Sequence, residues 1–163
     1  MTDYAALLQA LAHAGVKFIV VGGLAATAHG AARVTYDLDV VYSRDPAGIA
    51  NLIRALKPHH PSLRGAPKGV PFIFDERTIR AGLNFTFSTD LGEIDILGEI
   101  VGGGTYEDIA PHSFEIELFG ITCRCLELDK LIEVKRAAGR PKDFEAIAEL
   151  EAIREERDKL TGH

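Results

Sequence analysis

The segment VVGGLAATAHGAARVTYDLDVVY, residues 20–42, places two adjacent glycines and two aspartates in an otherwise apolar part of the chain. Its second half, VTYDLDVVY, has the composition of a β-strand. Successive side chains of a strand point to opposite faces, so Leu38 and Val40 share one face while Asp37 and Asp39 share the other. The two carboxylates would repel each other unless a positive charge lay between them. The segment therefore predicts a strand with one apolar face and one acidic face, and the simplest counter-charge is a divalent metal ion.

The segment GEIDIL, residues 92–97, repeats this pattern, because its isoleucines face one way and Glu93 and Asp95 the other. If the two strands are neighbours, Asp95 completes a cluster of three carboxylates with Asp37 and Asp39. Oxygen ligands suit Mg²⁺ or Mn²⁺, and three carboxylates can hold two ions about 3.5–4 Å apart for phosphoryl chemistry. The alternative is that each aspartate faces water on the open side of a sheet.

The paired glycines, Gly22 and Gly23, lie between the strand KFIVV and an alanine-rich segment predicted to be a short helix. Backbone N–H groups at such a junction can bind phosphate, although ordinary turn chemistry is the alternative. No Gly-Lys-Ser/Thr follows and G-x-G-x-x-G is absent, which excludes the two common phosphate-binding loops. Arg33 and Thr35 could also contact phosphate, and Arg33 could equally pair with a carboxylate for structure.

Length and composition predict one domain over residues 1–163, with the helices from about residue 128 as an extension. The net charge of −6 argues against a protein that coats nucleic acid. No apolar run approaches the roughly 18 residues of a membrane helix, and residues 1–15 resemble an amphipathic helix more than a signal peptide. These features predict a cytoplasmic protein that does not use a membrane.

Periodicity and turn residues predict a mixed α/β (α+β) sheet, with helices mainly on one face and the C-terminal helices packed against it. The predicted helices cover residues 4–14, 24–31, 46–56, 128–138 and 142–159, and the predicted strands cover 17–21, 34–42, 84–89, 93–97, 114–118 and 122–128. Residues 58–82 are rich in proline and glycine and are predicted to be an irregular loop or lid.

Several other polar residues are expected to have ordinary roles. His59 and His60 are expected to face solvent, His29 to end a helix, and Cys123 and Cys125 to be reduced thiols in a strand. Two groups of basic residues are expected to be mostly solvated charges: Arg64, Lys68, Arg77 and Arg80, and then Lys130, Lys135, Arg136, Arg140 and Lys142.

These motifs together resemble the nucleotidyltransferase superfamily related to DNA polymerase beta. The matching features are a strand followed by GG and a short helix, then RVTYDLDVV, and later GEIDIL. The tail LDKLIEVKRAAGRPKDFEAI is most similar to bacterial AbiEii-type and minimal nucleotidyltransferases of toxin–antitoxin systems. The resemblance covers nearly the whole chain.

The resemblance implies that Gly22 and Gly23 cradle a nucleoside triphosphate and that three aspartates, Asp37, Asp39 and Asp95, bind the metals. Asp95 would hold the catalytic metal beside the attacking hydroxyl. Lys135 and Asp143 match the tail motif that completes the active site. The toxin pattern often has a further aspartate where this chain has Ala146, so Asp143 could instead simply begin a helix after Pro141.

The resemblance implies an enzyme that uses Mg²⁺ or Mn²⁺ to move a nucleoside monophosphate from an NTP to a hydroxyl on RNA, possibly tRNA, or on a protein. Its partners would be the NTP, this acceptor and a cognate toxin or antitoxin protein. The alternative is a non-catalytic nucleotide-binding or antitoxin-like module that binds a partner protein, because one fold carries many functions.

Overall fold

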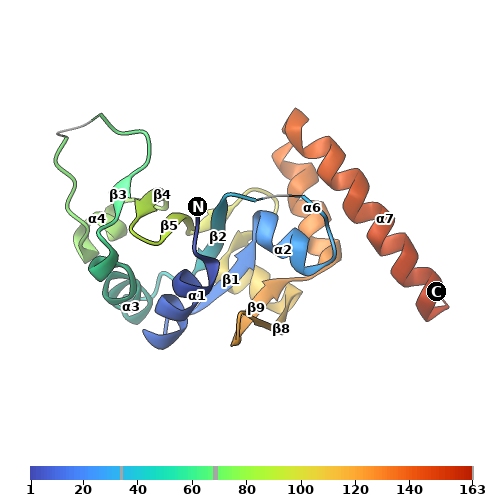
Figure 1. The fold of residues 1–163 in the computed structure, drawn as a ribbon, viewed down its shortest axis with the longest axis horizontal. Coiled ribbons are helices and arrows are strands. Elements are labelled where there is room, and N and C mark those ends of the chain that lie inside the picture. The colour runs from blue at the N-terminus through green and yellow to red at the C-terminus, as the bar shows by residue number, and fades with distance from the viewer. Residues whose placement is uncertain (34, 68–69, 163) are drawn as a thin grey trace.

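A seven-stranded mixed sheet forms the centre of the molecule (Figure 1). The computed structural model describes residues 1–33, 35–67 and 70–162. The strand order is β3-β4-β5-β2-β1-β9-β8. The strands are β1 Phe18–Val21, β2 Asp37–Tyr42, β3 Ser62–Leu63, β4 Asn84–Thr89, β5 Gly92–Leu97, β8 Ser113–Leu118 and β9 Ile121–Leu126. The mixed sheet with helices confirms the predicted α/β class.

The central strand β2 pairs antiparallel with β1 and parallel with β5. In the β2–β5 register, Leu38 lies opposite Ile94 and Asp39 lies opposite Asp95. Two parallel neighbours cannot be joined by a tight turn and need a long connection. The connection between β2 and β5 contains α3 (Pro46–Leu56), β3, α4 (Glu76–Ala81) and β4. The two strands are therefore neighbours, with their apolar side chains on one face and their acidic side chains on the other.

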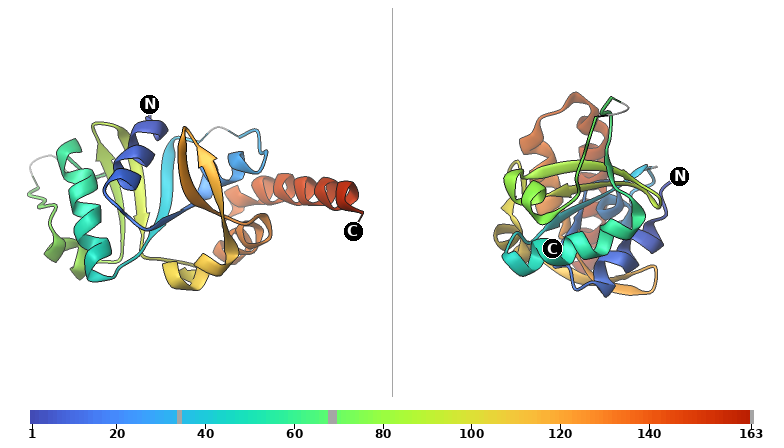
Figure 2. Two further views of the ribbon diagram at one scale, coloured as in Figure 1. Left: turned by 90° about the horizontal axis from the view of Figure 1, so that it is seen from below. Right: turned by 90° about the vertical axis from the view of Figure 1, so that its left-hand side faces the viewer.

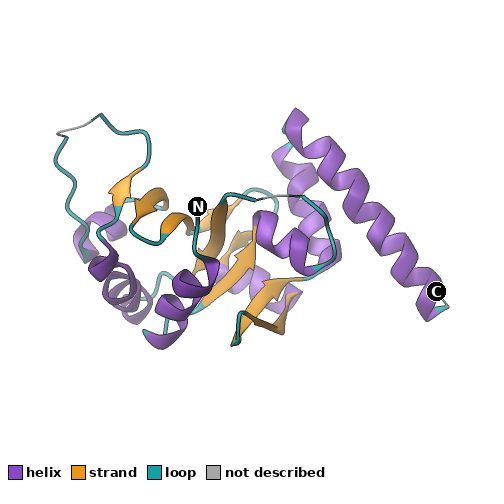
Figure 3. Ribbon diagram, in the orientation of Figure 1, coloured by secondary structure: helices purple, strands orange, loops and turns teal. Residues whose placement is uncertain are grey.

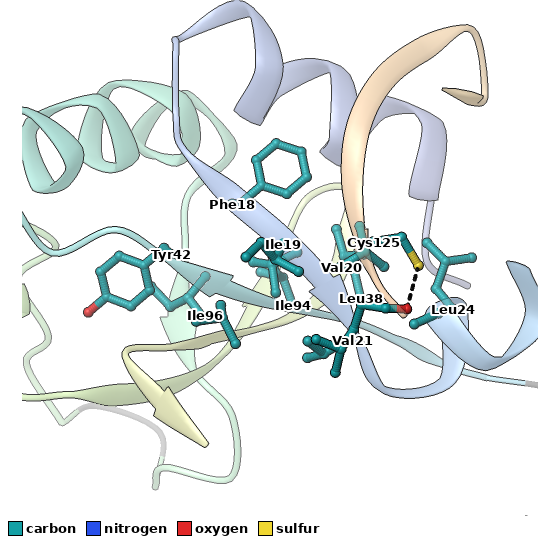
Figure 4. Close-up of a cluster of buried hydrophobic side chains, with 14 of the residues drawn as sticks. Phe18, Ile19, Val20, Val21, Leu24, Leu38, Tyr42, Ile94, Ile96 and Cys125 are labelled. Atoms are coloured by element: carbon teal, nitrogen blue, oxygen red, sulfur yellow. Dashed lines mark hydrogen bonds between the residues drawn. The ribbon is translucent and has the colours of Figure 1, made fainter. Parts of the chain in front are cut away.

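The apolar face of β2 and β5 is part of the hydrophobic core (Figure 4). Leu38, Val40, Ile94 and Ile96 are fully buried. Burying each such side chain contributes about 1.5–3 kcal/mol relative to exposure. Buried leucines and isoleucines of α1 (Tyr4–His13) and α3 (Pro46–Leu56) belong to the same core, and these two helices contact each other.

Helix capping follows the sequence at both of these helices. The Asp3 carboxylate accepts a hydrogen bond from the backbone N–H of Ala6, and the Asp45 carboxylate accepts one from the N–H of Gly48. Such caps satisfy N–H groups that the helix itself cannot. Pro46 occupies the first turn of α3, as predicted, where its missing N–H costs nothing.

The remaining helices show that the prediction of helices mainly on one face was too simple. Helix α2 (Gly22–Ala28) contacts β1 and β2, and α6 (Leu128–Ala138) contacts α2. Leu131 and Lys135 of α6 line a cavity together with the acidic residues Asp39 and Asp95. Helix α6 therefore borders the acidic face. Helix α7 (Phe144–Thr161) packs on α6, and its C-terminal part extends away from the sheet (Figure 2).

Local differences from the predictions lie mainly at element ends (Figure 3). Strand β2 begins at Asp37, and Val34, where it was predicted to begin, lies outside the described residues. Residues 58–82 contain β3 and the helix α4 (Glu76–Ala81), which Asp75 caps through the N–H of Thr78. The sequence analysis also missed three short elements: β6 Glu99–Ile100, β7 Gly104–Thr105 and α5 Tyr106–Ile109.

Short 3₁₀ helices cover Lys57–His59, Ala110–His112 and Pro141–Asp143. Across the described ranges, every helix is too short or too polar to cross a lipid bilayer.

Candidate metal centre

Three aspartates meet on the acidic face of the sheet. Asp37 and Asp39 come from β2, and the parallel register places Asp95 of β5 directly beside Asp39. One carboxylate oxygen from each residue lies within 4.8 Å of the other two. In the part of the chain that the structure describes, this is the one group of three potential ligands with that spacing. The predicted three-carboxylate cluster is therefore present, and its oxygen-only composition suits Mg²⁺ or Mn²⁺.

The carboxyl group of Asp39 is largely buried in the cluster. Burial raises the pKa of its carboxyl to about 8, and the neighbouring Asp95 and Asp37 carboxylates add to the rise, while Lys135 opposes it. Its Oδ1 atom is buried and has no hydrogen-bond partner among the described residues. A buried carboxylate oxygen without a donor is costly unless a proton or a cation compensates it. This oxygen fits the metal that the sequence implies.

Arg64 also lies in the cluster, although the sequence analysis expected it to be a solvated charge. Its Nη1 lies 3.3 Å from Asp37 Oδ2, its Nη2 lies 3.0 Å from Asp95 Oδ1, and its Nε lies 3.1 Å from Glu93 Oε2. Glu93 is thus a fourth carboxylate on this face. A basic residue between two acidic strands in the sequence could have suggested this contact. Predicting it would also have required the strand order β3-β4-β5, which brings Arg64 close to β5.

Lys135 extends from α6 to the same site. It lines the cavity that contains Asp39 and Asp95. Burial lowers the pKa of its ammonium group, and the nearby Asp143 and Asp39 carboxylates counteract the change. Lys135 therefore places a positive charge beside Asp39, and its predicted role in completing an active site stays a prediction.

Asp143 has a different position from the metal-binding aspartates. It is buried, and its Oδ2 accepts a hydrogen bond of 2.7 Å from Arg140 Nε. It lies in the 3₁₀ turn Pro141–Asp143 and is the residue before α7. The Asp143 carboxylate forms an ion pair with Arg140 and attracts the Lys135 ammonium group. Its role in the site would therefore be to position these two cations.

The paired glycines allow close packing around the cluster. Gly22 has a φ of +66°, and a Cβ atom there would lie 2.1 Å from Asp39 Oδ2. A Cβ atom at Gly23 would lie 2.5 Å from Thr35 Oγ1. The glycines thus let the start of α2 approach Asp39 and Thr35, which is a structural reason for both residues. Their predicted contact with phosphate stays a prediction.

Arg33 and Thr35 have structural contacts within the chain. Arg33 forms ion pairs with Glu145 and Glu149 of α7, at 3.2 and 3.5 Å. Thr35 donates a hydrogen bond of 3.2 Å from its hydroxyl to the backbone carbonyl of Asp37. Arg33 was predicted either to pair with a carboxylate or to bind phosphate, and in the structure it pairs with carboxylates. Phosphate binding by Arg33 and Thr35 stays a prediction.

A cavity of about 420 Å³ opens beside the cluster. Asp39 and Asp95 line one side, and Leu131, Val134 and Lys135 of α6 line another. Arg140 adds a second positive charge to the lining. The volume lies in the range of small-molecule sites, and apolar walls with a few converging charges are typical of them.

Some of the residues expected to have ordinary roles have them, whereas Arg64 does not, and His59 is half-buried. His29 follows the last residue of α2, is buried, and its Nε2 lies 2.7 Å from the carbonyl oxygen of Leu126. His60 is exposed and pairs with Asp90. Cys123 and Cys125 are free and buried in β9. Lys68 lies outside the described residues.

Comparison with protein-family models finds no match to this chain, and comparison with curated proteins finds none either. The acidic cluster and the cavity beside it are therefore the features that indicate a function.

Proposed function

We propose that this protein is a metal-dependent nucleotidyltransferase that moves a nucleoside monophosphate from an NTP to a hydroxyl group on RNA or on a protein. One observation carries the proposal: oxygens of Asp37, Asp39 and Asp95 lie within 4.8 Å of one another on two paired strands. Rigid strands hold such ligands more precisely than loops do. The resemblance to toxin–antitoxin nucleotidyltransferases agrees with this chemistry.

The three aspartates would hold Mg²⁺ or Mn²⁺, which supplies charge neutralisation at the phosphates. In the transfer, the acceptor oxygen forms a bond to the α-phosphorus, the bond from that phosphorus to the β-bridging oxygen breaks, and pyrophosphate leaves. The hydroxyl proton passes to water. Catalysis then depends on positioning and on fixed charges, with no covalent intermediate on the protein.

The cavity beside the cluster is the proposed nucleotide site. Its apolar wall, which includes Leu131 and Val134, suits a nucleoside, and its two cations, Lys135 and Arg140, suit the phosphates. Asp143 pairs with Arg140 and so holds that cation in the lining of the cavity.

A specific observation also favours the second candidate, a non-catalytic module that binds a partner protein. Residues predicted to bind nucleotide or to complete the active site already have contacts within the chain: Gly22 packs closely on Asp39, Gly23 packs on Thr35, Arg33 pairs with α7, and Asp143 pairs with Arg140. If the protein is such a binding module, the acidic cluster contributes only to packing and charge balance.

Transfer of label from α-phosphate-labelled NTPs separates the two candidates. The purified protein is incubated with each NTP, Mn²⁺, and bulk RNA or cell protein as acceptor. We expect transfer with at least one NTP, and a fall of about 100-fold or more in Asp95→Asn with nucleotide binding largely kept. The control is Asp90→Asn, which makes the same chemical change in the turn before β5. No transfer with any NTP would favour the binding module.

A further inference from the structure

Arg64 divides the acidic cluster into two halves. Its guanidinium contacts three carboxylates with one nitrogen each: Nη1 with Asp37, Nε with Glu93 and Nη2 with Asp95. No ion pair links it to Asp39. Asp37 and Glu93 therefore already have a positive charge beside them and do not line the cavity, whereas Asp39 and Asp95 line it and share only the Arg64 contact to Asp95.

Arg64 is held in this position by the main chain as well as by charge. Its Nη2 donates a hydrogen bond of 2.9 Å to the carbonyl of Phe87, and its backbone N–H donates one of 3.0 Å to the carbonyl of Thr86. Both acceptors belong to β4, which lies between β3 and β5 in the sheet. The side chain of Arg64 is only 25% exposed. Exposed ion pairs contribute little to stability. Arg64 is held more firmly than the side chain of an exposed pair, because it is mostly buried and hydrogen-bonded to the main chain.

The half of the cluster near Asp39 has oxygens that Arg64 does not satisfy. Asp39 Oδ1 and Asp95 Oδ1 are both buried without a hydrogen-bond partner in the described residues. The contact of Asp95 Oδ1 with Arg64 Nη2 is an ion pair without hydrogen-bond geometry. A cation between Asp39 and Asp95 would satisfy both oxygens.

The formal charges support the same division. Four carboxylates face Arg64 and Lys135, and the charge of Arg140 is balanced by Asp143, so two negative charges are left uncompensated when all groups are ionised. One divalent ion balances them. A second divalent ion would need the space and the ligands that Arg64 now takes, and it would place two further positive charges beside a guanidinium.

We propose that the cluster binds one divalent ion, between Asp39 and Asp95, and that Arg64 replaces the second ion that these carboxylates could otherwise hold. This inference rests on the proposed metal site and specifies its stoichiometry. Arg64 is then a positioning residue: it fixes Asp37 and Asp95 and supplies a permanent positive charge where a two-metal enzyme has an ion.

Counting bound Mn²⁺ tests the proposal without any activity. The number of ions per chain is measured by electron paramagnetic resonance at saturating Mn²⁺ for wild type, Arg64→Gln and Arg64→Lys. We expect one ion in wild type, two in Arg64→Gln, and one in Arg64→Lys, which keeps the charge. Arg80→Gln is the control, since Arg80 pairs with Glu76 on the exposed side of α4.

Two ions in wild type would overturn the proposal, because Arg64 would then be displaced by metal. One ion in folded Arg64→Gln, or two in Arg64→Lys, would also overturn it. If Arg64→Gln fails to fold, the wild-type and Arg64→Lys counts still decide between one ion and two. No bound Mn²⁺ in any variant would instead contradict the metal site itself, which is the basis of the proposed function.

Discussion

The two faces of β2 and β5 differ sharply in polarity and burial. On one face, Leu38 and Ile94 lie opposite each other and are fully buried among apolar neighbours. On the other, one residue along, Asp39 and Asp95 lie opposite each other with buried oxygens that lack donors. The same backbone ladder between β2 and β5 supports both arrangements.

The difference shows how one pair of strands serves both stability and chemistry. The apolar face lowers the free energy of the folded chain, whereas the acidic face raises it through desolvation and repulsion. Natural proteins tolerate such local costs mainly at functional sites. The contrast can be tested by comparing substitutions on the two faces.

The largest effect on stability is expected on the apolar face. Leu38→Ala should lower the free energy of unfolding by about 2–5 kcal/mol, because it removes a fully buried side chain and leaves a cavity. Asp37→Asn, at the neighbouring position, should change it by less than about 1 kcal/mol, since it removes both repulsion and an ion pair. Urea unfolding measures both. Equal losses would mean that the acidic face is structural.

Gly22→Ala should have the next largest effect, because it adds a methyl group 2.1 Å from Asp39 Oδ2 at a φ of +66°. We expect a loss of about 2–3 kcal/mol together with weaker Mn²⁺ binding. Gly120→Ala is the matched control: its φ is +80° and a Cβ atom there would meet nothing within 4 Å. Gly120→Ala should therefore cost only the backbone strain. If the two variants behave alike, close packing against Asp39 is not the reason for Gly22.

Over one pH unit, the smallest of these effects is a dependence of stability on pH. In the folded chain the pKa of Asp39 is raised to about 8, whereas an unfolded aspartate has a pKa of about 3.9. Between these values the unfolded chain has lost a proton that the folded chain keeps, so stability should fall as pH rises, by on the order of 1 kcal/mol per pH unit, and level off above pH 8.

Asp39→Asn removes the titrating group, so its stability should depend less on pH than that of wild type between pH 5 and 8. Chemical unfolding in metal-free buffer at several pH values makes the comparison. Parallel curves for the two proteins would show that Asp39 ionises normally in the folded chain.

The sequence predicted the parts of the fold that depend on local patterns. The helix at residues 46–56 and the strand at 84–89 have the predicted ends, because Asp45 with Pro46 marks a helix start and the turn at Asp90–Gly92 separates two alternating strands. The alternation of Asp37 and Asp39 with apolar residues also identified the acidic face correctly. In each case the decisive residues lie within one turn or one strand.

The parts that the sequence did not predict depend on contacts between distant segments. Arg64 reaches Glu93 and Asp95 only because β3, β4 and β5 are adjacent in the sheet. The short strand Ser62–Leu63 has too few residues to show alternation, so its position was hidden in a loop rich in proline and glycine. The pairing of Arg33 with α7 likewise joins residues more than a hundred positions apart.

Thermal unfolding with and without Mn²⁺ tests the metal site most directly. At an Mn²⁺ concentration of about 100 times Kd, binding to the folded chain should add about 2.7 kcal/mol and raise the Tm of wild type by roughly 5–10 °C. Asp39→Asn should show little or none of this rise, while Asp90→Asn should keep it. No rise in wild type, or an equal rise in Asp39→Asn, would contradict a metal centre formed by Asp37, Asp39 and Asp95.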